Sequence, residues 1–410
     1  MAEGASGGPV KVLYIVYWGA LEPLGRALVL PSVKRLSALG AQITLVTFDK
    51  PSDLERADDV ERIGGSLREA GVRWLPLRYH KRPKVPATAF DVGHGIARGI
   101  LERIRERPDV VHGRTFIGGL AAQAVARLTR AKLIYHNEGF YPDEQVDGGV
   151  WREGSLPHRA ARGLERRLYA GSDAVFSLSM AGKGIIESID GVRAKGTPVV
   201  VVPSAVDLDR FSMSKRTRTL DGSLRLVYIG SVGGRYLVDR VGRFAHVARQ
   251  VRPDTHLDLL TPAEHDLVRD MLSSGGLADD AWSSQFVPHE RLPDQLGRED
   301  AGLFFLTGGL SAAGFSPTKV GEYWAMGLPV ISTPGMADVD EIIRAERVGV
   351  VVRDHTDNAY RDALMELLSL LGDSELTNRC RSAAERHYGL ESACERQLAI
   401  YETLAAERRD

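Results

Sequence analysis

The sequence predicts an α/β protein of two Rossmann-like domains, each a doubly wound parallel sheet with helices on both faces. Two observations lead to this fold class. Short apolar runs of strand length alternate with amphipathic helical patterns along almost the whole chain. The length of 410 residues is also well above the roughly 100–200 residues of a typical domain, which favours two domains.

The first half opens with a buried strand at residues 11–16, a tight turn at 17–20, a helix at 25–39 and a strand at 41–48. The same alternation continues to residue 203. We expect further strands at 72–76, 109–112, 132–136, 174–178 and 198–203, and helices at 61–70, 93–106, 118–128 and 157–170. Strands that alternate with helices in this way are joined by crossovers, which requires a parallel sheet.

The second half repeats this architecture. It follows a polar stretch at 212–223, which lacks hydrophobic periodicity and is predicted to link the domains. A strand at 224–229 and a glycine-rich turn at 230–234 then begin the second domain. We place the domains at 1–206 and 207–390, and expect the final amphipathic helix, 391–410, to pack back on the first domain.

Composition narrows the classes of function. The net charge of −1 argues against nucleic acid as the principal partner, because phosphate binding leaves a basic excess. Neither Cys380 nor Cys394 lies in a metal-ligand spacing, so we expect no metal site and a reducing, cytoplasmic location. We expect neither a signal peptide nor a membrane-spanning helix, because residues 1–9 lack the basic and apolar regions of a signal peptide and no apolar run reaches about 18 residues.

The strongest chemical signal is a helix start in the second half. Ser316, Pro317 and Thr318 place a proline at the first turn beside a hydroxyl cap, which leaves backbone N–H groups free to bind an anion. Lys319 adds a positive charge where the helix dipole disfavours cations. Because lysine is rare in this sequence, we interpret its placement here as a sign of a bound phosphate.

Glu322 lies one helical turn beyond Thr318. From that position its carboxylate can accept hydrogen bonds from the vicinal hydroxyls of a ribose. The alternative for the same residue is an ordinary carboxylate on the helix surface or at a cap.

These residues resemble a known family. The pattern Ser-Pro-Thr-Lys-x-x-Glu-Tyr-x-Ala-x-Gly-x-Pro-Val-Ile at 316–331 is similar to the donor-site signature of the retaining GT-B glycosyltransferases of family 4. Segments at 202–211, 228–231 and 109–112 resemble the family's hinge, the strand and turn that open its nucleotide domain, and a strand end of its N-terminal domain. The resemblance implies sugar transfer from a nucleotide-diphosphate donor with retained anomeric configuration, and no metal or other cofactor.

The resemblance also implies roles for residues of the second domain. The expected donor-binding residues are Gly230, Ser231, Gly314, Phe315, Ser316, Pro317, Thr318 and Glu322, together with Gly19 of the first domain. Family members carry a glutamate that contacts sugar hydroxyls at the position of Gly314, so here either backbone groups of residues 313–316 bind the sugar or the loop has another register.

Catalysis is expected to depend on stabilisation of the leaving group, because the departing diphosphate gains negative charge. The family's arginine and lysine pair after the Gly230 turn is reduced to Arg235, and Lys319 is expected to supply the second charge. Arg235 and Lys319 are therefore candidate catalytic residues. The diphosphate itself can take the acceptor proton, in which case no protein base is needed.

The first domain is expected to bind the acceptor at the carboxyl ends of its strands. Gly19 follows the first strand, where a glycine admits a ligand or simply makes a tight turn. His112, at the end of a later strand, is either a catalytic residue or a satisfied core histidine.

The expected acceptor-binding residues follow two strands. For those that follow the second strand, at 136–144, the alternative is an ordinary solvated loop. The expected residues are Arg114, His136, Glu138, Asp143 and Glu144. Residues 138–144 resemble an Arg-Gly-Phe-x-x-Asp-Glu segment of one branch of the family, with Glu138 in place of the arginine. That charge reversal favours an amine-bearing or neutral acceptor.

The Arg-rich helix at 157–170 has two interpretations. It is either a solvated amphipathic face or a peripheral contact with anionic lipid at the inner membrane surface, as in relatives that act on lipid-linked acceptors.

We predict a glycosyltransferase whose acceptor is a glycan, a glycolipid or a secondary metabolite. A nucleotide-sugar 2-epimerase of the same fold is an alternative, and would use groups such as Glu138, Asp143 and His112. A non-catalytic sugar-nucleotide-binding scaffold is a second alternative, which Gly314 favours. A dinucleotide oxidoreductase is disfavoured, because neither glycine-rich turn forms G-x-G-x-x-G.

Overall fold

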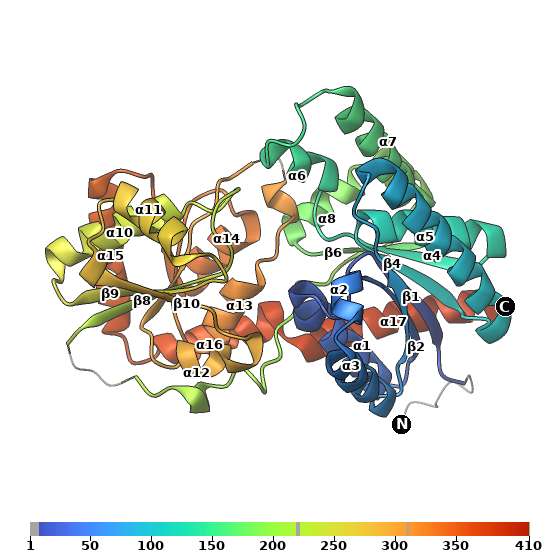
Figure 1. The fold of residues 1–410 in the computed structure, drawn as a ribbon, viewed down its shortest axis with the longest axis horizontal. Coiled ribbons are helices and arrows are strands. Elements are labelled where there is room, and N and C mark those ends of the chain that lie inside the picture. The colour runs from blue at the N-terminus through green and yellow to red at the C-terminus, as the bar shows by residue number, and fades with distance from the viewer. Residues whose placement is uncertain (1–7, 219–221, 310, 410) are drawn as a thin grey trace. The chain divides into compact units, whose positions relative to one another are not determined.

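The computed structural model of the protein describes residues 8–218, 222–309 and 311–409. The chain divides into two compact units, each with its own wholly parallel sheet (Figure 1), which confirms the predicted fold class. The first unit comprises Met1–Pro142, Arg152–Pro203 and Leu390–Asp410. The second unit comprises Asp143–Trp151 and Ser204–Gly389.

The sheet of the first unit has seven strands in the order β3-β2-β1-β4-β5-β6-β7. The strands are β1 (Lys11–Val16), β2 (Gln42–Asp49), β3 (Arg73–Arg78), β4 (Val110–Arg114), β5 (Lys132–His136), β6 (Ala174–Ser177) and β7 (Val199–Val201). The chain runs outward from β1 to β3 and then returns to add β4 on the other side of β1. The order therefore reverses between β1 and β4, where open α/β sheets bind ligands.

Helices cover this sheet because its central strands are buried on both faces. They are α1 (Leu30–Ala38), α2 (Pro51–Leu54), α3 (Ala57–Glu69), α4 (Lys84–Glu106), α5 (Phe116–Thr129), α7 (Leu156–Gly171), α8 (Met180–Glu187), α9 (Asp190–Lys195) and α17 (Leu390–Arg409). A π-helical turn, Gly25–Val29, precedes α1, where one continuous helix was predicted. Helix α6 (Tyr141–Asp147) lies at the boundary and contributes residues to both units.

The last helix, α17, belongs to the first unit and packs against α1, β4 and β5 (red in Figure 1). Its apolar stripe is buried there, with Cys394, Tyr401 and Leu404 almost fully enclosed. Among the described residues, no helix is both long and apolar enough to cross a membrane.

The sheet of the second unit has six strands in the order β10-β9-β8-β11-β12-β13. The strands are β8 (Leu224–Ile229), β9 (Thr255–Leu260), β10 (Trp282–Gln285), β11 (Ala301–Phe304), β12 (Val330–Ser332) and β13 (Gly349–Val351). The helices are α10 (Val238–Val251), α11 (His265–Ser274), α12 (Leu292–Leu296), α13 (Thr318–Ala325), α14 (Ala337–Glu346), α15 (Asp357–Leu371) and α16 (Leu376–Tyr388). Short 3₁₀ turns lie at Met213–Lys215, Asp279–Ala281, His289–Arg291 and Ala312–Gly314.

This second order reverses between β8 and β11. Helix α13 is fixed beside these strands by Tyr323, whose ring packs where a Cβ on Gly302 of β11 would lie 2.4 Å from it. The Tyr323 hydroxyl also accepts the backbone N–H of Ile229, the last residue of β8, at 3.0 Å. Helix α13 is therefore tied to the two strands between which the strand order reverses.

The described residues of the predicted linker, 212–218 and 222–223, belong to the second unit, whereas the sequence predicted a link between the domains. Arg218 forms an ion pair with Asp300, with 2.9 Å between Nε and Oδ1, and the same guanidinium donates to the Ser223 carbonyl. Polar residues without periodicity can thus be held by buried charge pairs, which a search for hydrophobic patterns does not detect.

The carboxyl group of Glu299 generates a prediction about stability. It is fully buried near Asp258, and burial raises its pKa to about 9. Because the folded-state pKa is raised, its favourable contribution is complete below the unfolded-state pKa and is lost as pH rises towards 9. We therefore expect Glu299→Gln to raise the melting temperature by at least about 2–4 °C at pH 8.5 and to change it little at pH 5.

Thermal unfolding followed by circular dichroism at both pH values checks this. Glu341→Gln, on the exposed face of α14, is the matched control. A melting temperature for Glu299→Gln that is equal to or below that of the wild type at pH 8.5 would contradict the analysis.

Candidate functional site

The candidate site lies in the second unit, where the start of α13 meets the carboxyl ends of β8 and β11. Lys319, in the first turn of α13, is a partly exposed residue, yet its ammonium group is buried. This reverses the usual arrangement, in which a lysine buries its stem and keeps its charge in water. The Nζ atom lies 4.1, 5.2 and 5.9 Å from the ring centroids of Tyr236, Tyr228 and Phe304.

The Nζ atom of Lys319 is buried and has no hydrogen-bond partner in the described part of the chain. Contact with aromatic rings is its main compensation. Burial lowers the pKa of Lys319 to about 7, and the Glu322 carboxylate acts in the opposite direction. Lys319 is thus not the permanent positive charge that the sequence predicts, because near neutral pH its proton is only partly retained.

Gly230 is required for this arrangement. Its φ angle is +123°, and a Cβ at this position would lie 2.6 Å from Lys319 Nζ. The turn is held at both ends, because the Gly230 N–H donates to the Leu260 carbonyl and the Tyr228 hydroxyl donates to the carbonyl of Ser231. Of the two expected donor-binding residues in this turn, Gly230 touches the amine and Ser231 has an exposed side chain.

Arg235 follows the same turn, and its guanidinium is already engaged. It donates to the Ser311 hydroxyl at 2.7 Å and to the Thr307 carbonyl at 3.1 Å, and it stacks 4.7 Å from the Phe315 ring centroid. Asp147 Oδ2 lies 3.9 Å from Nη2. The sequence predicted Arg235 and Phe315 but missed Ser311 and Asp147.

The helix start departs from the prediction in one respect. Pro317, and not a hydroxyl residue, is the N-cap of α13, and no side chain caps this end. The Ser316 hydroxyl accepts the backbone N–H of Ser204 at 3.2 Å, so it is occupied elsewhere. The N–H groups of Thr318 and Lys319 have no acceptor among residues 8–218, 222–309 and 311–409, which keeps this end open to an anion.

The loop before α13 also differs from the expectation. Gly314 is buried in a 3₁₀ turn, where its N–H donates to the Ser311 carbonyl at 3.0 Å. The N–H of Phe315 donates to the Ala312 carbonyl at 3.2 Å. These two backbone N–H groups are therefore engaged within the loop, which disfavours the first of the two alternatives, sugar binding by backbone groups of residues 313–316.

Glu322 is a buried residue and not a surface carboxylate, because only 5% of its side chain is exposed. Its Oε1 atom lies 2.6 Å from His289 Nε2. His289 was missed by sequence reasoning, since a lone histidine in a short loop carries no recognisable pattern.

In the first unit, His112 does not fit the expected catalytic role. It is fully buried, its ring stacks 4.1 Å from that of Tyr14, and its Nδ1 lies 2.6 Å from the Tyr401 hydroxyl of α17. Burial lowers its pKa well below the usual value, so the ring is neutral. His136 beside it is equally buried, with a lowered pKa of the same cause. Both are core histidines in this structure.

The inferred charge reversal at Glu138 is also corrected. Its carboxylate pairs with Arg114, with 2.5 Å between Oε1 and Nε, and Arg114 is itself buried. Burial raises the pKa of Glu138, whereas Arg114 acts in the opposite direction. The pair therefore presents no net negative charge to an acceptor.

The remaining predicted residues are dispersed. Gly19 allows close packing, because a Cβ there would lie 2.9 Å from Asp49 Oδ1. Asp143 and Glu144 lie in α6 and belong to the second unit, whereas His136 lies in the first. The predicted acceptor residues are thus divided between the two units.

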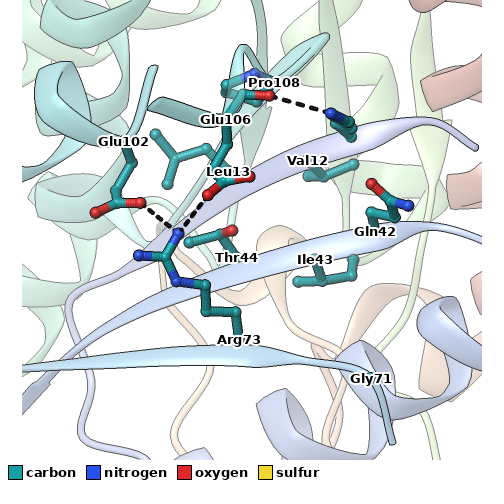
Figure 2. A pocket seen from close by; sticks show the side chains of 11 residues that line it. Val12, Leu13, Gln42, Ile43, Thr44, Gly71, Arg73, Glu102, Glu106 and Pro108 are labelled. Carbon is teal, nitrogen blue, oxygen red and sulfur yellow. Dashed lines mark hydrogen bonds and ion pairs between the residues drawn. The ribbon is translucent and has the colours of Figure 1, made fainter. Parts of the chain in front are cut away.

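One pocket of the first unit lies away from all of these residues. It has a volume of about 250 Å³ and opens at the amino ends of β1, β2 and β3 (Figure 2). Arg73 spans it to reach Glu102 at 2.8 Å and Glu106 at 2.9 Å. Ligands of open α/β sheets bind at the opposite, carboxyl edge, so this pocket is not the candidate site.

Comparison with solved structures finds the same fold over almost the whole chain. Sucrose-phosphate synthase from Thermosynechococcus elongatus has a TM-score of 0.71 at 14% identity, over 97% of this chain and 100% of that one. The Anabaena protein HepE in complex with UDP and glucose has a TM-score of 0.63 at 13% identity, over 97% and 100%. A putative UDP-N-acetylglucosamine 2-epimerase from Listeria monocytogenes has a TM-score of 0.61 at 14% identity, over 98% of each chain.

At these identities the likeness shows the fold alone. No curated protein matches the chain. Two family models do: residues 27–205 match the glycosyl transferase 4-like domain, and residues 223–370 match the glycosyl transferases group 1 domain. Since the two matches cover most of both units, the chain belongs to the glycosyltransferases of the GT-B fold.

Proposed function

We propose that this glycosyltransferase takes its sugar from a nucleotide-diphosphate donor, and that the diphosphate binds at the start of α13. The observation that carries this proposal is the unpartnered amine of Lys319, buried beside the Gly230 turn. The Thr318 and Lys319 N–H groups lie at the same helix end, where the helix dipole favours an anion. That Anabaena HepE is solved with UDP and with UDP-glucose supports uridine nucleotides as the first probes.

The chemistry follows from where charge develops. The bond between the sugar C1 and the diphosphate oxygen breaks, and a bond from C1 to an acceptor oxygen forms on the same face, which retains the configuration. The acceptor proton passes to the departing diphosphate. Lys319, Arg235 and the helix start stabilise the charge on this leaving group, and loss of one such contact costs about 3–4 kcal/mol of barrier.

For the acceptor we propose a neutral hydroxyl compound. The ion pair of Arg114 with Glu138 leaves this part of the first unit without net charge, which removes the reason to expect an amine. Helix α7 presents Leu156 and Leu164 to solvent next to its arginines, which supports a lipid-linked acceptor.

A nucleotide-sugar epimerase is the second candidate, because one structural neighbour carries that description. The structure disfavours it, since His112 and His136 are buried neutral side chains. An epimerase would also interconvert sugars without an acceptor.

The proposed function is tested by titrating the protein with UDP, GDP and UMP in a calorimeter at pH 7. We expect one of the two diphosphates to bind, and UDP to bind at least about tenfold more tightly than UMP if uridine is the base. Lys319→Met should abolish most of this preference.

Slow hydrolysis of the matching nucleotide sugar, followed by proton NMR, should release the retained anomer first. Absence of nucleotide binding would refute the nucleotide-diphosphate donor. First release of the inverted anomer would refute retention of configuration.

The buried amine predicts a pH dependence. Diphosphate binding favours the charged form of Lys319, so binding takes up a proton when the free amine is neutral. Because the free pKa is about 7, the protonated fraction of the free amine falls about fiftyfold between pH 7 and 9, and nucleotide affinity should fall with it, by up to the same factor. Lys319→Arg should flatten this dependence, whereas Lys215→Arg, at an exposed ion pair with Asp294, should leave it unchanged. An affinity of the wild type that does not vary over this range would contradict the assignment.

Asp147 predicts a gain of affinity. Its Oδ2 accepts the Ser311 N–H at 2.9 Å and the Ser311 hydroxyl at 2.7 Å, and lies 3.9 Å from Arg235. A Cβ on Gly309 would lie 2.4 Å from the same oxygen, so the loop is shaped around this carboxylate.

Asp147 thus holds the groups that a phosphate would bind. Asp147→Asn should lower the dissociation constant of UDP by about three- to tenfold and leave uridine binding unchanged. Asp239→Asn, on α10, is the control of equal charge change. Weaker UDP binding by Asp147→Asn would show instead that Asp147 holds Arg235 in place for the ligand.

A further inference from the structure

Glu322 has an imidazole partner that the proposed mechanism does not use. His289 Nε2 lies 2.6 Å from Glu322 Oε1, in a part of the second unit that is partly open, since 27% of the His289 side chain is exposed. The second carboxylate oxygen, Oε2, makes no hydrogen bond within the described ranges, yet it is not among the buried unpaired atoms. One oxygen of Glu322 is therefore held and the other is available.

The tautomer of His289 follows from its other neighbour. Arg210 Nη2 lies 2.5 Å from His289 Nδ1 and 2.6 Å from the His289 carbonyl oxygen. A guanidinium has only donors, so Nδ1 must accept and the ring proton must be on Nε2. His289 is thus a neutral imidazole that donates from Nε2 to Glu322.

Arg210 is itself fixed by its local sequence. Asp207 Oδ1 accepts the backbone N–H groups of Asp209 and Arg210, both at 3.1 Å, and so forms a tight turn. The guanidinium lies 5.4 Å from the Phe211 ring centroid, and Phe211, itself buried, contacts the His289 ring at 5.6 Å. Arg210, near the beginning of the second unit, is therefore connected to Glu322 of α13 by the His289 ring, which contacts both side chains.

We propose that His289, oriented by Arg210, is a positioning residue for nucleoside recognition, because it fixes Glu322 so that Oε2 is presented to the vicinal hydroxyls of the ribose. This inference rests on the proposed function, since it requires a nucleotide at the start of α13. It extends that function by assigning ribose selectivity to a pair of residues outside the helix.

The chemistry explains why a neutral ring suits this position. A lysine or arginine against Glu322 would offset the charge that makes the carboxylate a strong acceptor. A neutral imidazole satisfies one oxygen and leaves the other for a charge-assisted hydrogen bond from a hydroxyl. Without the ring, a buried carboxylate would lose its partner and turn to find another.

The test compares ribose and dideoxyribose ligands by calorimetry on the full chain. The probes are UDP and 2′,3′-dideoxy-UDP, with GDP and its dideoxy analogue used in parallel. For the wild type we expect the ribose form to bind at least about tenfold more tightly. His289→Phe, which keeps the contact with Phe211, should weaken ribonucleotide binding about tenfold and dideoxynucleotide binding less than twofold.

Two further variants separate positioning from mere structure. His289→Gln, whose side-chain amide can still donate to Glu322, should retain most of the ribose preference. Arg210→Met, which frees Nδ1, should lose part of it. His265→Phe is the matched control, because His265 also has an arginine neighbour, Arg269, and a stacked ring but no carboxylate partner on α13.

Equal weakening of both ligands by His289→Phe would show a structural role only and overturn the inference. Unchanged binding of both ligands would also overturn it. Failure of the wild type to bind any of the four nucleotides would instead refute the proposed function, and the inference with it. Thermal melting of each variant shows whether it is folded.

Discussion

The structure of the second unit centres on the Lys319 amine, which points into the protein. The Lys319 amine lies among three aromatic rings at a helix start, where no carboxylate or carbonyl of the described residues accepts its protons. Such an arrangement is costly for a charged group and is expected where a ligand supplies the missing partner. Glycine suits position 230 because its φ angle of +123° strains other residues, and because a Cβ there would crowd this amine.

The groups around this amine have complementary tasks. Tyr323 ties α13 to β8, one of the two strands between which the strand order reverses. The Arg235 guanidinium is held by hydrogen bonds to the Ser311 hydroxyl and the Thr307 carbonyl. Glu322 faces another partner, His289, one helical turn further along. Anion binding, leaving-group stabilisation and nucleoside recognition thus depend on one short helix of eight residues.

The fold and the helix start could be predicted from sequence because both have local signals. Strand and helix periodicities span a few residues each, and the Ser-Pro-Thr-Lys pattern is continuous. The partners Asp147 and His289 could not be predicted, since they lie 164 residues from Ser311 and 33 from Glu322, and only the folded chain brings them together. The misassigned residues differ from the prediction because of their burial. His112 is of a residue type common in active sites, but it is fully buried in the core.

A crystal structure of the protein with UDP tests the central claim most directly. We expect the diphosphate at the start of α13, within hydrogen-bonding distance of Lys319 Nζ and of the first backbone N–H groups of the helix. A diphosphate bound elsewhere, with Lys319 still enclosed by its aromatic rings, would contradict the account.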